Sequence, residues 1–348
     1  MVKEETYLCC YLLIKSPINM RRLWLWILSA TLLIGCKPDD QTEPASAGIV
    51  VKKWTDPVVT VENGLAADPS VIRVGDQLLM IYSEYSLATD AIAFHAVVSS
   101  DGINWQGLSQ APGSEIFSGS ATNDWDRLIE TPELIRIGED YYLYYIGYPD
   151  AELNNGIYAS QIGLAIGTEP ESIARVGDVP LLARGGPVDV DALTSPSVVE
   201  HEGTYYMLYT GWSNILSGDG FLGQTAATST DGISWNKLDE GIFTEVATST
   251  FETATEADIV KGTDGLFYLF YSAEGGIALA RSDPPLGPWE LYPEMLISSE
   301  LTWESGEVVA PTALIENGKA KIWYSGIVGN FGGGSIGYAE IDFPFEWD

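Results

Sequence analysis

The sequence predicts an all-β protein folded as a five-bladed β-propeller, with four antiparallel strands in each blade. Two observations lead to this prediction. One short pattern returns five times at intervals of about 54 to 64 residues, and self-similarity at a steady spacing is the signature of a repeat architecture. The strand that the last repeat lacks is found before the first repeat. Residues 49–348 are therefore expected to form a single closed ring.

Each repeat begins with a small or acidic residue before a proline position and a β-rich run. The five starts read ADPSVI, ETPELI, TSPSVV, TEADIV and VAPTAL. A turn with Gly or Asn follows, then an aromatic strand such as YYLYYIG, then a strand of small residues such as QIGLAIG. Turn residues between short β-rich runs are typical of antiparallel strands. Because a lone four-stranded sheet leaves its edges exposed, the units are expected to pack side by side and close radially.

The closure of the ring is predicted from the two ends of this region. The outer strands of three repeats carry Trp105, Trp235 and Trp289, whereas the last repeat has no obvious fourth strand. The segment IVVKKW, which ends at Trp54, has the pattern of that strand. We therefore expect residues 49–54 to lie on the fifth blade and to latch the ring.

The N-terminal region predicts export. Met20 is followed by Arg21, Arg22 and an apolar run of about 12 residues, which is shorter than the roughly 20 residues that a spanning helix needs. Residues 1–36 are expected to be a signal region whose true start is Met20.

The apolar run ends in LLIGC, which resembles the bacterial lipoprotein box. The resemblance implies cleavage and lipidation at Cys36, and an ordinary signal peptide with a chance cysteine is the alternative. Residues 37–48 are polar and suit a flexible tether. Because Lys37 follows the cysteine, the resemblance implies an anchor in the outer membrane.

The charge of the chain excludes several function classes. The chain has 17 basic and 49 acidic residues, a net charge of -32, and loss of residues 1–36 would make the charge about -34. Such a charge argues against nucleic acid and anionic lipid as partners, so membrane contact is expected through the lipid alone. Neutral ligands or cations fit better. With one cysteine in the mature chain and two histidines in all, no cofactor is required, while calcium near the axis stays open.

Carboxylates collect at the starts of the predicted inner strands. Asp68 and Glu256 stand directly before the proline position of their repeats, and Glu130 stands two residues before it. In an antiparallel blade these starts share one face of the disc with the loops between second and third strands. The three carboxylates are therefore expected to point near the central axis, where they are the candidate catalytic residues.

Further side chains on this face suit contacts with a ligand. Aromatic faces beside carboxylates suit a sugar, because the C–H surface of the sugar ring stacks while its hydroxyls bond the acids. Glu84 and Glu274 end their second strands where other repeats have glycine. The candidates for substrate contacts are Glu84, His95, Arg127, Glu133, Tyr148, Trp212, Asp258 and Glu274.

Most of these residues also have a structural interpretation. Asp before Pro is common in turns, which is the alternative for Asp68. Glu133 and Asp258 are compatible with salt bridges at the rim, His95 with a satisfied core histidine, and Arg127 with an ion pair. Structural bonds between blades are expected of four acids that recur before the repeats, namely Asp126, Asp191, Glu252 and Glu304.

The pattern of the repeats resembles a known superfamily. Asp-Pro opens the first repeat, and Trp125-Asp126 and Trp303-Glu304 precede later ones. In this the chain resembles the five-bladed glycoside hydrolases of families 43, 32, 117 and 130 over residues 49–348. In families 32 and 43 the resemblance implies a blade-one Asp as nucleophile or base, a blade-two Asp that tunes the acid, and a blade-three Glu as general acid.

The catalytic pattern of the superfamily is matched only in part. Asp68 matches the first role, and ETPELI resembles the ECPDLF stretch of family 32, which places Glu130 on the general-acid position, but in blade two. Blade three has Thr194 and Ser195 at the matching positions. This departure leaves open a reassigned set of Asp68, Glu130 and Glu256, a divergent mechanism, or an inactive site.

The expected function is that of a glycoside hydrolase acting on plant or algal oligosaccharides at the cell surface or in the periplasm. Long loops over the axis favour an exo-acting pocket. The main alternative is a non-catalytic glycan-binding surface lipoprotein that uses the same face, and a third is a scaffold for protein partners. A phosphorylase would need a phosphate pocket, against which the scarcity of basic residues argues.

Overall fold

The computed structural model describes residues 48–89, 91–108, 114–149, 159–214, 220–243, 254–329 and 333–346. The predicted signal region, the lipidation site Cys36 and all but the last residue of the predicted tether lie outside these ranges. In the part of the chain that is described, no helix has the length and apolar character that crossing a membrane requires.

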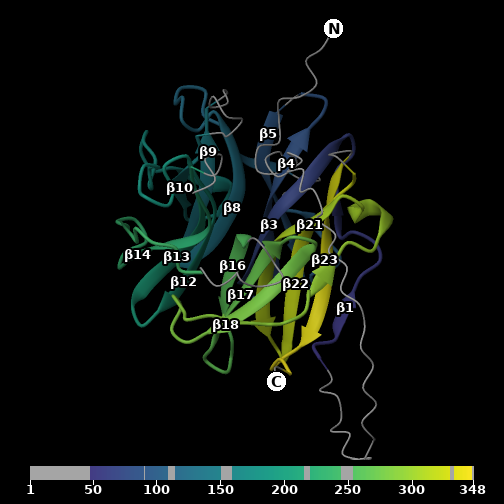
Figure 1. Ribbon diagram of the computed structural model, residues 1–348. Helices are drawn as coiled ribbons and strands as arrows, with labels where there is room; N and C mark the ends of the chain where they lie inside the picture. Colours follow the sequence, from purple (N-terminus) through teal and green to yellow (C-terminus); the bar gives the residue numbers. More distant parts are fainter. Residues whose placement is uncertain are drawn as a thin grey trace, which may run out of the picture.

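Five four-stranded antiparallel units follow one another along the described chain (Figure 1). The first unit contains β3 (Gly64–Val74), β4 (Gln77–Ser86), β5 (Ala91–Ser99) and β6 (Gln106–Gly107). The second contains β8 (Leu128–Ile137), β9 (Asp140–Tyr148), β10 (Gln161–Gly167) and β11 (Ala174–Arg175). The third contains β12 (Ala192–His201), β13 (Thr204–Ser213), β14 (Phe221–Ser229) and β15 (Asn236–Lys237). The fourth contains β16 (Thr255–Lys261), β17 (Phe267–Ala273), β18 (Gly276–Ser282) and β19 (Glu290–Leu291). The fifth contains β21 (Glu307–Glu316), β22 (Lys319–Ile327), β23 (Gly334–Asp342) and β1 (Val51–Lys53). Three short strands, β7 (Ser114–Ser118), β20 (Ile297–Ser298) and β2 (Val59–Thr60), pair with β5, β18 and β23.

The first strands of the units surround a common axis. β3, β8, β12, β16 and β21 each contact the next in this order, and β21 contacts β3 again. In Figure 1 the purple start of the described chain accordingly lies beside the yellow C-terminal strands. Four-stranded antiparallel units closed into a ring are the arrangement of a β-propeller, so the predicted fold class is confirmed.

The N-terminal strand completes the last unit, as the sequence predicts. β1 pairs antiparallel with β23, with Val51 opposite Ile341. Trp54 continues this pairing, because its backbone N–H donates to the Tyr338 carbonyl at 3.0 Å and its ring meets the Tyr338 ring edge-on at 4.7 Å.

A bulge in each inner strand sets the geometry of the axis. In all five units the ladder between the first two strands shifts register at the proline position. A non-glycine residue there adopts the left-handed region, which costs roughly 1 kcal/mol per residue. These bulge residues are Asp68 (φ 51°), Thr131 (48°), Ser195 (51°), Glu256 (46°) and Ala310 (48°).

A belt of hydrogen bonds joins the units just beyond the bulges. In each unit the side chain two residues after the bulge residue accepts a backbone N–H from the next unit. The five bonds are Leu134 N to Ser70 Oγ (2.9 Å), Val198 N to Glu133 Oε1 (2.9 Å), Ile259 N to Ser197 Oγ (3.0 Å), Ala313 N to Asp258 Oδ2 (2.6 Å) and Val71 N to Thr312 Oγ1 (3.4 Å). The fifth bond returns to the first unit, so the belt is a closed circle. It explains why each repeat has a polar residue at this position.

The belt corrects one interpretation of the sequence. Glu133 and Asp258 are not rim salt-bridge partners, because both are buried in the belt. Ser70 Oγ donates to Glu133 at 3.1 Å, and Ser197 Oγ donates to Asp258 at 2.8 Å. A hydroxyl can donate once while it accepts, and this capacity links one belt position to the next.

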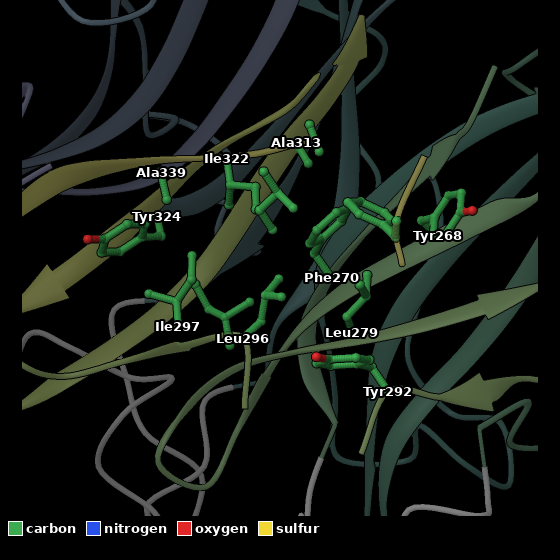
Figure 2. Packing of buried hydrophobic residues seen from close by; sticks show 14 of the residues in the cluster. Tyr268, Phe270, Leu279, Tyr292, Leu296, Ile297, Ala313, Ile322, Tyr324 and Ala339 are labelled. Atoms are coloured by element: carbon green, nitrogen blue, oxygen red, sulfur yellow. The ribbon is translucent and has the colours of Figure 1, made fainter. Parts of the chain in front are cut away.

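Apolar side chains fill the spaces between neighbouring units. Figure 2 shows one such cluster, in which Phe270 and Leu279 of the fourth unit face Ile322 of the fifth. Ile49 and Val51 from the N-terminal segment pack against the same cluster. The segment that closes the last unit therefore also covers apolar surface, which stabilises the closed ring.

Candidate active site

The residues at the bulges and in the belt line a partly open cavity of about 40 Å³ on the axis. All five inner strands line it with the residues around their proline positions. Its carboxyl groups are those of Asp68, Glu133, Glu256 and Asp258, and its hydroxyl groups are those of Thr131, Ser195, Ser197 and Thr312. No Lys, Arg or aromatic residue is among the described residues of the lining.

Asp68 and Glu256 hold their backbones in the same way. The Asp68 N–H donates to Ser325 Oγ at 2.8 Å, and the Glu256 N–H donates to Thr210 Oγ1 at 3.1 Å. In each case the hydroxyl belongs to the second strand of the preceding unit. These anchors fix the left-handed backbone of both bulge residues, whose side chains line the same cavity.

The two carboxyl groups differ in their affinity for a proton. Burial raises the pKa of Asp68 to about 6. Burial, and then the charge of Asp68, raise the pKa of Glu256 to about 8, although Ser272 Oγ donates to Glu256 Oε2 at 2.9 Å. At neutral pH Asp68 is therefore mainly ionised while Glu256 keeps its proton. Paired carboxyls with separated pKa values are the pattern of an acid and a base in one site.

Glu133 and Asp258 form a second acidic pair in the lining of the same cavity. Burial raises the pKa of both carboxyls, and the charge of Asp258 raises that of Glu133 further. Their oxygens accept hydrogen bonds from backbone N–H groups and serine hydroxyls of the belt. Both were predicted to contact substrate, and the structure places them in the axial wall.

Glu130 is buried beside an aromatic side chain. Tyr148 Oη donates to Glu130 Oε1 at 2.8 Å. The matching pair in the third unit is Trp212 Nε1 and Thr194 Oγ1, at 3.2 Å. The cavity lining begins one residue after Glu130, at its neighbour Thr131. The structure therefore brings Asp68 and Glu256 together in the cavity and groups Glu130 with Tyr148.

Glu84 and His95 lie together in the first unit. His95 Nδ1 is 3.4 Å from Glu84 Oε2, and Tyr82 Oη donates to the same oxygen at 3.2 Å. His95 lies on the third strand directly opposite Tyr82, as Thr225 lies opposite Tyr209.

The remaining two candidates are exposed. Arg127 Nη1 donates to the Ala121 carbonyl at 3.3 Å, within its own loop, instead of pairing with an acid there. Glu274 lies in the turn after β17. The register corrects its alignment: Ser272 faces Thr255, so Ala273 takes the glycine position and Glu274 matches Tyr148 and Trp212.

In three units an acid that precedes the first strand is buried and bonds a tyrosine and a cation of the same unit. Asp126 Oδ2 accepts from Tyr145 Oη at 3.1 Å and from Arg175 Nε at 2.6 Å. The matching groups are Asp189, Tyr209 and Lys237 in the third unit and Glu304, Tyr324 and Lys53 in the fifth. We call these three sets the closed triads.

The closed triads refine the prediction for these acids. Asp126 and Glu304 have the structural role that was expected, but they bond within a unit instead of between blades. In the third unit the acid is Asp189, whereas Asp191 accepts from the Asn214 backbone at 2.7 Å. Glu252 lies outside the described residues.

Two features of the site were not predicted from the sequence. Glu307 raises the pKa of Glu256 by its charge, yet it stands three residues before the bulge residue of its unit, where other repeats have no acid. The cations of the closed triads come from outer strands of only two or three residues, which have no periodic pattern. The one signal for Glu307 in the sequence is its position at the start of the last inner strand. Calcium near the axis stays open; in the described ranges, no group of three or more metal-ligating side chains is found.

Comparison with known proteins gives both a family and a set of similar folds. Residues 55–324 match the family model described as glycosyl hydrolases family 43. The chain is 24% identical over 204 residues to 1,2-beta-oligomannan phosphorylase from Thermoanaerobacter sp. (strain X514). That match covers 58% of this chain, and the chain spans 65% of the length of this relative.

Solved structures confirm the propeller. The structure of a complex of BT0996 with RGII has a TM-score of 0.67 at 17% identity, over 84% of this protein and 92% of that one. The structure of Zg3597, a family 117 glycoside hydrolase from the marine bacterium Zobellia galactanivorans, has a TM-score of 0.64 at 15% identity, over 87% and 93%. At such identities the similarity concerns the fold.

Proposed function

Since the chain belongs to family 43 of the glycosyl hydrolases, and is on that ground a glycosidase, we propose that it hydrolyses plant or algal oligosaccharides from their ends. Asp68 and Glu256 are the proposed catalytic pair. The observation that carries this assignment is that both carboxyls line one axial cavity, where burial raises the pKa of Asp68 to about 6 and that of Glu256 to about 8.

The proposed steps follow from these pKa values. Glu256 gives its proton to the glycosidic oxygen as the bond to the sugar breaks. Ionised Asp68 either takes a proton from the attacking water or attacks the sugar carbon itself, according to the distance between the carboxyls. In the second case water then hydrolyses the covalent intermediate, with Glu256 as the base that takes the proton of this water. Glu130, held by Tyr148, is the third candidate, and its place next to Thr131 suits a bond to the sugar near the cleaved linkage.

Water is the proposed acceptor, although the curated relative is a phosphorylase. Phosphate recognition needs positive charge or clustered N–H donors. The described lining of the cavity has four carboxyls and no Lys or Arg. A phosphate dianion would therefore meet negative charge without compensation.

A substrate panel tests the proposal. The protein without residues 1–36 is incubated with aryl glycosides and with plant and algal oligosaccharides, with and without phosphate, and products are separated by chromatography. We expect release of single sugars from chain ends at a rate that phosphate does not raise. Sugar phosphates among the products would contradict hydrolysis, and a mixture of long fragments would contradict the exo mode.

A second candidate function has one observation in its favour. The third unit has Thr194 and Ser195 where the resemblance implies an acid. A propeller that binds glycans without cutting them would show saturable binding on the panel and no product. That outcome would replace hydrolysis as the proposed function.

We also propose that Cys36 anchors the protein in the outer membrane by a lipid. The LLIGC sequence and the polar stretch after it support this proposal. Expressed with its signal, the wild type is expected in the outer-membrane fraction, and Cys36→Ser is expected to move it out of that fraction. Equal amounts of both proteins in the outer membrane would refute the anchor.

A further inference from the structure

The first unit departs from the closed triads of the second, third and fifth units. In the second, third and fifth units the acid has no exposed side-chain surface and pairs with a cation. In the first unit the matching tyrosine, Tyr82, donates instead to Glu84, which lies on the same strand. The side chains of Glu84 and His95 are 18% and 15% exposed. We call Glu84 and His95 the open cluster, because the Glu84 carboxylate is partly exposed whereas the acids of the closed triads have no exposed surface. The His95 side chain is about as exposed as the triad cations, which are 14%, 24% and 19% exposed.

Glu84 replaces a glycine that the closed triads require. In the second unit a Cβ at Gly147 would come within 2.5 Å of the Asp126 Cβ. In the fifth unit a Cβ at Gly326 would meet the Glu304 Cβ at 3.0 Å. A side chain at this position and an acid from the preceding loop therefore exclude each other. In the first unit the side chain at this position supplies the carboxylate itself.

His95 stands where the second and fifth units have a glycine, and in those units a tryptophan covers the tyrosine of the triad. In the second unit Trp125 stacks on Tyr145, with ring centroids 6.1 Å apart. A Cβ at Gly163, the position that matches His95, would come within 2.7 Å of the Trp125 ring. The fifth unit repeats this arrangement with Trp303 and Gly337. A side chain at the position of His95 is therefore incompatible with a stacked tryptophan.

The open cluster faces the same end of the first unit as the candidate catalytic residue. Glu84 is paired with Ala66, two residues before Asp68 on β3. The next residue pair, Ser83 and Ala67, leads directly to the bulge at Asp68. Neither Glu84 nor His95 lines the axial cavity, so the open cluster lies outside that lining, at the end of the first unit where Asp68 stands.

We propose that Glu84 and His95 form a subsite that binds neighbouring hydroxyl groups of a neutral sugar. This inference rests on the proposed function. The Glu84 carboxylate accepts a hydrogen bond from one hydroxyl, and the imidazole of His95 bonds a second. A sugar that lacks these hydroxyls would lose both hydrogen bonds and is expected to bind more weakly.

The negative charge of Glu84 favours a neutral sugar in the subsite. The Lys and Arg of the closed triads are held by buried acids. The stretches 90, 109–113, 150–158, 215–219, 244–253 and 330–332 contain no Lys, Arg or His in their sequence. A uronic acid, a sulfate or a phosphate on the sugar would bring a second negative charge next to the Glu84 carboxylate.

The variants Glu84→Gln and His95→Ala test the subsite. Kinetics are measured on a neutral oligosaccharide that the wild type cleaves, and sugar binding is measured by calorimetry in an Asp68→Asn background. We expect each variant to raise KM and to weaken binding at least about 10-fold, with kcat within about threefold. The matched control is Thr225→Ala, at the position of His95 in the third unit, where KM is expected to stay unchanged.

Matched ligands test the charge. A neutral sugar and its counterpart with a carboxylate at C6 are compared by calorimetry, and the carboxylate is expected to bind at least about 100-fold more weakly. Equal binding of the two sugars overturns the neutral class.

The outcomes separate the subsite from the hydrolase. Turnover with unchanged KM in both variants overturns the subsite and keeps the hydrolase. Saturable binding without turnover, weakened in both variants, keeps the subsite and overturns the hydrolase. Lower melting temperatures with unchanged binding would assign Glu84 and His95 a purely structural role and overturn the subsite.

Discussion

Asp68→Asn and Glu256→Gln are each expected to lower turnover at least about 100-fold, and Asp68→Asn is expected to raise the melting temperature. Turnover falls because one variant lacks the ionised carboxyl and the other lacks the proton donor. Stability rises because the buried carboxylate of Asp68 is costly to ionise in the folded protein. Loss of activity with a gain of stability distinguishes a catalytic acid from a structural one.

The pH dependence follows from the same pKa values. Activity requires Asp68 ionised and Glu256 protonated, so kcat/KM is expected to be bell-shaped, with limbs near the pKa values of about 6 and about 8. The pKa of Asp68 is raised in the folded protein, so its contribution to stability is full below pH 3.8 and is lost as the pH rises through 6. At pH 8 the destabilisation that Asp68→Asn removes is on the order of 3 kcal/mol, from a rise of the Asp68 pKa from 3.8 to about 6.

The measurement is a comparison of melting temperature between pH 5 and pH 8. The wild type is expected to lose stability as the pH rises, and Asp68→Asn is expected to lose less. Asp101→Asn is the control, because hydrogen bonds from Asn104 and Ile103 lower the pKa of Asp101, and this variant is expected to be less stable than the wild type. Full turnover in Asp68→Asn or Glu256→Gln would remove that residue from the mechanism.

Lys53→Ala is expected to destabilise the protein by about 3 kcal/mol. Lys53 lies on β1 and pairs with Glu304, whose side chain has no exposed surface. Tyr324 Oη donates to Glu304 at 3.2 Å, and the Leu301 N–H donates at 3.1 Å, but neither brings a positive charge. Removal of Lys53 therefore leaves a buried carboxylate without its counter-charge. Urea unfolding measures the change.

Lys52→Ala is the matched control on the same strand. Lys52 is exposed and its ammonium lies 4.3 Å from the centroid of the Trp54 ring, a contact worth about 0.5–1 kcal/mol at the surface. If the two variants lost equal stability, the pairing of Lys53 with Glu304 would not hold the N-terminal strand in place.

The sequence predicts the fold well because its signals are local and repeated. The proline positions marked the five inner strands, and IVVKKW marked the closing strand, since each depends on a short pattern that needs no tertiary context. The bulges and the belt could not be predicted. Whether Glu133 lies in an axial belt or in a rim salt bridge depends on a register shift that no residue type specifies.

The candidate site was predicted in its members and not in its chemistry. Asp68 and Glu256 were expected near the axis from their places before the proline position, and the structure brings them together. Their separate pKa values depend on burial and on each other's charge, which a sequence does not contain. Glu274 was misaligned by one position because the glycine that served as a guide is Ala273 in that unit.

The pairing of β1 with β23 also determines the order in which the molecule is assembled. Its first described strand pairs with its last, so Val51 finds Ile341 only after everything between them has been synthesised. Contacts between distant parts of a chain slow folding and leave strand edges open in the meantime. The fifth unit is thus the last to be completed, and any chain that stops before β23 leaves β1 without the strand it pairs with.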